Sequence, residues 1–190
     1  MSFKFDPDYH IYTLNGNTLP SVTGIIKPLF DFSMINPEVL EYKRQLGTAV
    51  HLATELFDDN DLDESTLDEA VIPYLEAWKK FKVEMNVEII ASERPLYNVV
   101  HRYAGMIDRE ALVNKRPFLI DIKCTAALSP ATGIQLSGYK DMLGKPHNRR
   151  AAVQLKPNGN YVFQEYDDDG DFKVFLSLLN VENWRKKHVK

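Results

Sequence analysis

The chain has 190 residues, of which 44% are hydrophobic and 26% charged, with a formal net charge of −4 and one cysteine. This composition is typical of a folded globular protein; it excludes an internal disulfide or a four-cysteine iron–sulfur cluster, and argues against a basic nucleic-acid coat protein. No apolar run reaches the roughly 18–20 residues that span a membrane, and no leader pattern opens the chain, so we expect one cytoplasmic domain over residues 1–190 and no membrane partner.

The first half of the chain predicts a hairpin followed by helices. Asn15-Gly16 lies between strand-like flanks, and both central positions of a type I′ turn need positive φ. Ser21 is suited to cap a short helix. Pro37 is suited to open a longer one, which Gly47 is expected to interrupt or restart.

An acidic segment separates this helix from the next. Residues 58–69 hold seven acids and no base, which favours a solvated loop leading into a helix. Residues 68–83 then carry apolar side chains at helical spacing.

The second half predicts strands first and helices later. Residues 89–124 indicate a three-stranded antiparallel meander, 133–144 a helix, 149–166 a hairpin and 172–187 an amphipathic helix. The order of elements favours an α/β fold with a central mixed β-sheet flanked by helices and with N-terminal and C-terminal hairpins.

One strand of the meander carries charges on a single face. In LIDIKC, Asp121 and Lys123 alternate with apolar residues and therefore project together. A turn that pairs Asn114 with Pro117 would put Asp108 opposite Lys123, with Asp121 one diagonal step away. Two such carboxylates repel each other unless a cation or a proton intervenes.

This arrangement is suited to metal chemistry on phosphate esters. Carboxylate oxygens favour Mg²⁺ or Mn²⁺, which polarise a phosphoryl oxygen and acidify water. Lys123 would orient the attacking water or stabilise charge on the phosphate. For Asp108, Asp121 and Lys123 alone, a surface ion-pair ladder is the alternative interpretation.

Further residues accompany these three. Gly105 precedes Asp108 in the stretch GMID, Gln135 and Tyr139 share one helix face, and His51 follows Gly47 by one helical turn. In this order the segments PSVTGII, GTAVHLATE, YAGMID, LIDIKCT, IQLSGY and NWR resemble the PD-(D/E)XK nuclease superfamily. They are most similar to its RecB-like exonuclease branch, which includes small phage and bacterial exonucleases and the mitochondrial genome maintenance exonuclease.

The resemblance implies a restriction-endonuclease-like core and a role for each motif residue. Metal ligands for one or two Mg²⁺ or Mn²⁺ ions would be His51, Asp108, Asp121 and the carbonyl of Ile122. Catalytic residues would be Asp108, Asp121 and Lys123, and substrate contacts would come from Ser21, Thr23, Gln135 and Tyr139. Glu93 matches an acid often found one strand earlier, with a less settled role.

The implied function is metal-dependent DNA exonuclease activity in phage or bacterial recombination, repair or replication. The partners would be DNA ends and a single-strand-binding or annealing protein. A sequence- or structure-specific endonuclease and a noncatalytic nucleic-acid-binding relative stay open as alternatives.

Four other features carry expectations of their own. Cys124 stands where the branch often has Thr or Ser, and alternation turns it toward the core. Glu55 is either a residue that orients His51 or a surface acid. Trp184 and the basic residues 185–187 are expected to close the core and end the last helix, with a phosphate contact as the alternative.

Overall fold

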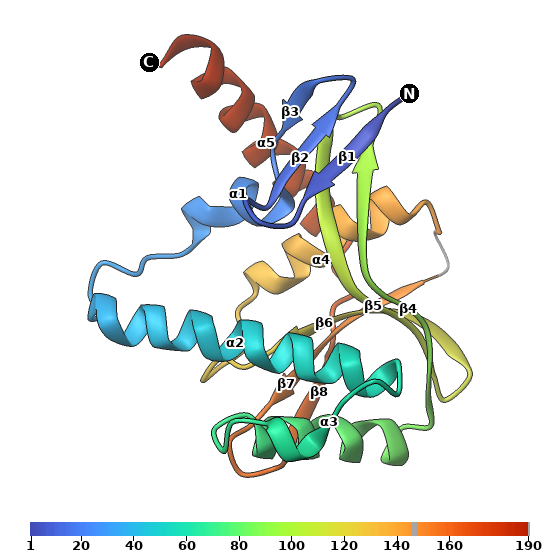
Figure 1. The fold of residues 1–190 in the computed structure, drawn as a ribbon. Helices are drawn as coiled ribbons and strands as arrows, with labels where there is room; N and C mark the ends of the chain where they lie inside the picture. Colours follow the sequence, from blue (N-terminus) through green and yellow to red (C-terminus); the bar gives the residue numbers. More distant parts are fainter. Residues whose placement is uncertain (146–147, 190) are drawn as a thin grey trace.

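The computed structural model describes residues 1–145 and 148–189, and it shows an α/β protein with a five-stranded mixed sheet, helices on both faces and a three-stranded N-terminal sheet (Figure 1). The strands are β1 (Phe3–Asp6), β2 (Ile11–Leu14), β3 (Asn17–Leu19), β4 (Val87–Asn98), β5 (Tyr103–Val113), β6 (Arg116–Lys123), β7 (Arg149–Leu155) and β8 (Tyr161–Glu165). The helices are α1 (Val22–Ile26), α2 (Pro37–Asp58), α3 (Ile72–Glu84), α4 (Ala131–Leu143) and α5 (Asp171–His188), with short 3-10 turns η1 (Lys27–Leu29) and η2 (Glu64–Thr66). None of the helices in the described ranges is long and apolar enough to cross a membrane.

The main sheet has the order β4-β5-β6-β7-β8. Strands β6 and β7 are parallel and joined through α4, whereas the other neighbours are antiparallel. A parallel pair needs such a crossover because the chain must return to the same end of the sheet. The predicted mixed sheet is therefore confirmed, as are the meander and the second hairpin.

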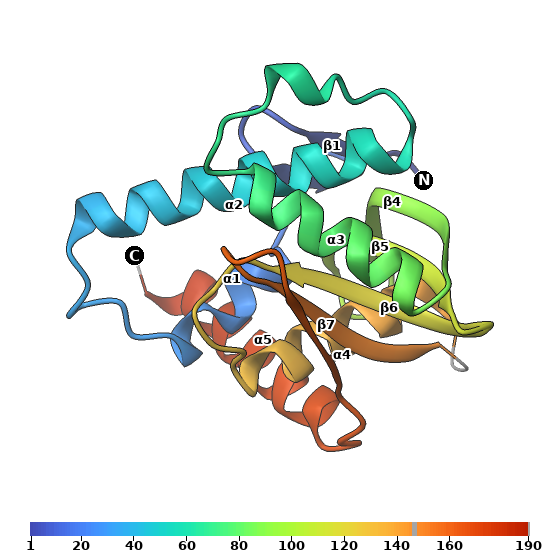
Figure 2. The ribbon, with the colours of Figure 1, turned by 90° about the horizontal axis from the view of Figure 1, so that it is seen from below.

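The sheet lies between two helical layers. Figure 2 shows α2 and α3 on one face and α1, α4 and α5 on the other. Ile120 and Ile122 of β6 pack against the α2 and α3 side, whereas Leu119, the residue before Ile120, belongs to the cluster on the other face. One face of this stretch is apolar throughout, whereas the other carries Asp121 and Lys123 after Leu119, so a slip of one residue would put these charges into the apolar core.

The turns follow the local sequence closely. Asn15 and Gly16 have φ of 50° and 80°, which confirms the first hairpin. Asn114 and Lys115 have φ of 48° and 65° and form a two-residue turn of the same kind.

The second turn corrects the predicted register. Val113 pairs with Arg116 and Arg109 with Ile120, so the pairing is shifted by two residues from the expected one. An even shift keeps the side-chain faces, but Asp108 comes level with Asp121 instead of with Lys123.

Three other expectations were wrong. Helix α2 runs unbroken for 22 residues through Gly47, with Asn36 as its cap. Asp58, expected in a solvated loop, ends that helix with its side chain fully buried. Trp184 does not close the core: it is 59% exposed and lies against His188.

Candidate functional site

A cavity of about 550 Å³ opens where α2, β4, β5, β6, α4 and the N-terminal sheet meet. The predicted site residues Ser21, Thr23, His51, Asp108, Asp121, Lys123, Gln135 and Tyr139 all line it. Ile122 contributes its backbone carbonyl, which lies 3.1 Å from Nε2 of His51. The fold therefore gathers residues that lie up to 118 positions apart in the sequence.

His51 projects from α2 toward three oxygen atoms. Its Nδ1 lies 3.5 Å from Oε1 of Glu93 and 3.8 Å from Oδ2 of Asp108, while Nε2 faces the carbonyl of Ile122. The ligand atoms of His51, Glu93 and Asp108 all lie within 4.8 Å of one another. The third member of this group is thus Glu93, where the sequence placed Asp121.

Glu93 occupies an unusual backbone conformation. Its φ is +40° in the middle of β4, a region that residues with a Cβ rarely adopt. Arg109 donates to its carboxylate at 3.1 Å and holds the side chain in place. Such strain is concentrated at functional sites, because only a surrounding structure that fixes the residue can sustain it.

The same irregularity affects Asp108 on the facing strand. Ile107 packs with the α1 and α4 cluster, whereas Arg109, two residues on, lies over Trp78 on the opposite side of the sheet. Regular alternation would put these two side chains on the same face of the sheet, so the strand is locally irregular between them. Asp108 lies at this irregularity, and its Oδ2 accepts a 2.7 Å hydrogen bond from the backbone N–H of Ile122.

Asp121 and Lys123 form a second group on the α4 side of the sheet. The Lys123 ammonium lies 2.7 Å from Oδ2 of Asp121 and donates to Oε1 of Gln135 at 3.1 Å. Gln135 in turn donates from Nε2 to the hydroxyl of Tyr139 at 3.1 Å. The expected shared face of Asp121 and Lys123 is confirmed, and the two α4 residues extend it.

Gly105 makes room for this group. A Cβ at Gly105 would lie 2.7 Å from Cε1 of Tyr139, inside van der Waals contact. The glycine of the GMID stretch therefore allows the tyrosine ring to pack directly on β5.

The charges in the cavity shift one another's pKa values. Burial alone would lower the pKa of His51, but the Asp108 and Glu93 carboxylates outweigh it and raise that pKa to about 9. Burial raises the pKa of Asp121 to about 6 although Lys123 opposes this shift, and burial also raises the pKa of Asp108. For Lys123, the nearby Asp121 and Asp108 carboxylates outweigh burial and raise the pKa. Near neutral pH, His51 and Lys123 are therefore both cationic.

The donor set fits a divalent ion. The His51 imidazole and the carboxylates of Glu93 and Asp108 lie within 4.8 Å of one another, and the Ile122 carbonyl faces the other ring nitrogen of His51. Carboxylate and carbonyl oxygens are the ligands that Mg²⁺ and Mn²⁺ prefer. Oδ2 of Asp121 is buried and, within the described residues, has no hydrogen bond of normal geometry despite the nearby ammonium. A cation near this oxygen would satisfy it.

A buried ion network supports Glu93 from behind. Arg109 is fully buried and donates to Asp58 at 2.8 Å, to Thr54 at 3.1 Å and to the Asp108 carbonyl at 2.7 Å. Asp58 also accepts from Trp78 at 3.1 Å and from Lys82. This network ties the C-terminal end of α2 to β5 and so fixes the distance between the helix and the acids.

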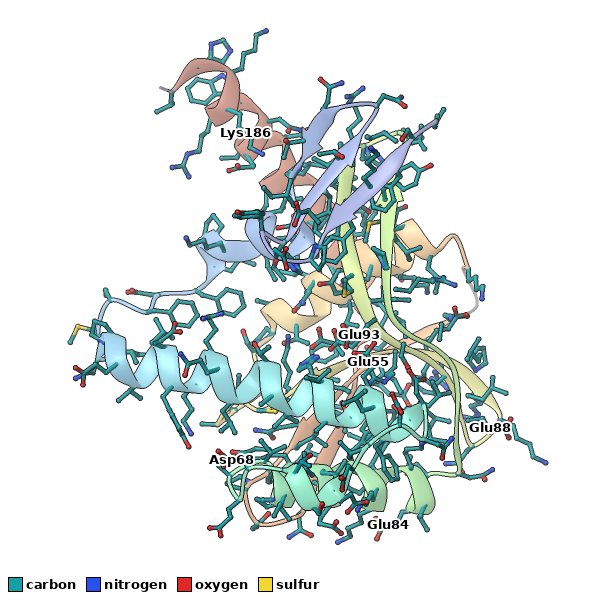
Figure 3. The ribbon with its side chains drawn as sticks, in the orientation of Figure 1. Glu55, Asp68, Glu84, Glu88, Glu93 and Lys186 are labelled. Carbon is teal, nitrogen blue, oxygen red and sulfur yellow. The ribbon has the colours of Figure 1, made fainter. Side chains whose placement is uncertain are left out.

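The remaining predicted residues have mixed outcomes. Ser21 caps α1 through Gly24 and lies 3.3 Å from Thr23, with both hydroxyls at the cavity. Glu93, and not Glu55, faces the His51 imidazole; Glu55 lies beside Glu93 between α2 and the bend of β4 and β5 (Figure 3). Cys124 packs on the α2 and α3 core as expected, and burial raises the pKa of its thiol to about 12.

The basic C-terminal residues lie elsewhere. Figure 3 shows Lys186 near the end of α5, away from Glu93, which lines the cavity. The helix ends at His188 as expected, but the alternative of a phosphate contact at this site finds no support from its position.

Comparisons with known proteins add little. No protein-family model matches the chain, and no curated protein does. A crystal structure of SSO0001 is similar over 93% of this chain and 80% of that one, with 15% identity and a TM-score of 0.43. A likeness at this level says nothing about activity.

Proposed function

We propose that this protein is a metal-dependent DNA nuclease, an exonuclease with the restriction-endonuclease-like core that its sequence resemblance implies. The observation that carries the proposal is the convergence of His51, Glu93 and Asp108 beside the Asp121–Lys123 pair, in one open cavity. Acids, an imidazole and a lysine around one site provide ligands for a cation and a charge for a phosphate.

In this proposal, His51, Glu93 and Asp108 would hold Mg²⁺ or Mn²⁺, and Asp121 and the Ile122 carbonyl would take part from neighbouring positions. The bound ion would supply positive charge to a phosphoryl oxygen and lower the pKa of water. His51 would bind the ion only in its neutral form, because a protonated imidazole cannot be a ligand.

Lys123 acts as a cation and not as a base. In the metal-free protein the Asp121 and Asp108 carboxylates raise the pKa of Lys123, which favours its protonated form. It stabilises the negative charge that builds up on the phosphate during attack. Gln135 accepts one of its hydrogen bonds and so aims the ammonium into the cavity.

The test is digestion of end-labelled single-stranded and double-stranded DNA with Mg²⁺ or Mn²⁺ and with a chelator. Removal of a preorganised charged group usually lowers turnover about a hundredfold or more, so we expect at least this loss for Glu93→Gln, Asp121→Asn and Lys123→Ala.

Matched controls are available on the same elements. Glu88→Gln changes an exposed acid on β4, and Lys186→Ala changes an exposed lysine on α5; Figure 3 shows both far from Glu93. Both should cleave like the wild type. Full activity of Lys123→Ala, or equal cleavage in the chelator, would rule out the proposed function.

A further inference from the structure

The N-terminal sheet forms a wall of the cavity that the metal centre does not use. Phe5, His10 and Tyr12 line the cavity together with the acids. We call these three residues the aromatic wall. Burial raises the pKa of Tyr12, and the Glu93 carboxylate adds to this shift, which is consistent with the wall lying close to the metal centre.

The aromatic wall is held rigidly. Phe5 stacks on Tyr12 at a centroid distance of 4.8 Å, and His10 meets both rings edge-on at 5.3 Å. Tyr12 is 1% exposed and its hydroxyl is hydrogen-bonded to Nε2 of His10 at 3.1 Å. Asp6 accepts from two backbone N–H groups of the turn that leads to His10. The wall is therefore formed before any ligand arrives, which lowers the entropy lost on binding.

Another wall of the cavity is cationic. Lys43, Arg44, Gly47 and Thr48 line it from α2, on the helix surface that also presents His51. Arg44 pairs with Glu41 at 2.7 Å, but the two side chains are 68% and 49% exposed, and such surface pairs contribute little. Gly47 leaves open space where a Cβ would stand, so a ligand can approach the helix backbone there.

Proteins that bind single-stranded nucleic acid combine aromatic rings with a positively charged groove. Bases stack on the rings, while cations follow the phosphates. Inside a duplex the base faces are already stacked on one another and are unavailable without extrusion. The two walls therefore favour an unpaired strand whose phosphate faces α2 and whose base faces β1 and β2.

We infer that the aromatic wall is a nucleobase-stacking subsite, in which Phe5 and His10 receive a base of a single strand whose phosphate lies toward Lys43 and Arg44. This inference rests on the proposed function, since it extends the same cavity. It assigns a specificity role to the N-terminal sheet, which the sequence presented only as a hairpin.

The test compares two fluorescently labelled strands of equal length, an oligodeoxyadenylate and an abasic strand with the same phosphates. Binding is measured by anisotropy in a chelator, so that no strand is cut. The wild type should bind the adenylate more tightly. Phe5→Leu and His10→Ala should each lose about fivefold or more in affinity for the adenylate, with little change for the abasic strand.

Phe3→Leu is the matched control. Phe3 lies two residues before Phe5 on β1 and packs on Tyr97 and Tyr12, but it does not line the cavity. The Phe3→Leu variant should still bind the adenylate more tightly than the abasic strand, while its free energy of unfolding falls about as much as that of Phe5→Leu. His10 is exposed, so His10→Ala tests the idea even if Phe5→Leu folds poorly.

The outcomes separate this inference from the proposed function. Equal wild-type binding of the two strands, equal effects of Phe3→Leu and Phe5→Leu, or no binding of either strand overturns the stacking subsite, even if metal-dependent cleavage is found. If the wild type prefers the adenylate, the Phe5 and His10 variants lose this preference, and no DNA is cleaved with metal, the stacking subsite is supported and the proposed nuclease function is rejected.

Discussion

Replacement of Arg109 by methionine tests the buried network behind the candidate site. The guanidinium is fully buried and links Asp58 to Glu93, with nitrogen–oxygen distances of 2.8 and 3.1 Å. Arg109→Met keeps much of the side-chain volume and removes the charge. Asp58 then retains Lys82 and Trp78, whereas Glu93 retains, among the described residues, only His51, whose Nδ1 lies 3.5 Å from its carboxylate.

The expected loss follows from the burial of these groups. Breaking a buried ion pair by removing one partner costs about 3–5 kcal/mol, because the other charge stays buried and unpaired. For a chain of 190 residues, this corresponds to a decrease in Tm of about 6–20 °C, at about 2–4 °C per kcal/mol. The remaining partners of Asp58 put the result toward the lower end of both ranges.

Urea denaturation in a chelator measures this free energy of unfolding. Arg44→Met is the control, because Arg44 is 68% exposed and its ion pair should contribute about 1 kcal/mol or less. A double-mutant cycle with Asp58→Asn should give a coupling energy of about 1 kcal/mol or more. If Arg109→Met and Arg44→Met destabilise the protein equally, the network does not hold the site as described.

Three further predictions concern the cavity and its surroundings. Because His51 has a folded pKa of about 9, above its ordinary 6.5, metal-free protein should lose stability as pH rises through this interval, and Mn²⁺ should restore it. Calorimetry near pH 7 in buffers of different ionisation enthalpy should show about one proton released, and this number should fall to about half a proton at pH 9. Gly105→Ala should displace Tyr139, destabilise the protein by about 1–3 kcal/mol and reduce cleavage, and unchanged melting would contradict the close contact. Tyr103→Phe leaves the Gly138 carbonyl and Asp141 without its hydroxyl, and urea denaturation should show a loss of about 1–3 kcal/mol.

Local physical chemistry determined the elements of this protein. Positive φ at Asn15-Gly16, the Ser21 cap and the alternation around Asp121 are properties of a few adjacent residues, and each was readable without coordinates. The common face of Asp121 and Lys123 was predictable because it depends only on the period of a strand. The identity of His51 as a site residue came from the resemblance, since an isolated helical histidine carries no such information.

The tertiary structure decided what surrounds those elements. Asp58 is buried because Arg109, 51 residues away in the sequence, lies opposite it, and no local pattern encodes that distance. Glu93 joins His51 and Asp108 through a backbone strain that only its packed neighbours sustain. The register of β5 and β6 depends on the turn, whose two central residues are Asn114 and Lys115. The alternation of side chains could not predict this position, because a shift by two residues leaves every side chain on the same face of the sheet. The period of a strand or helix thus determines which face a side chain occupies, whereas packing between distant segments determines which charged side chains come into contact.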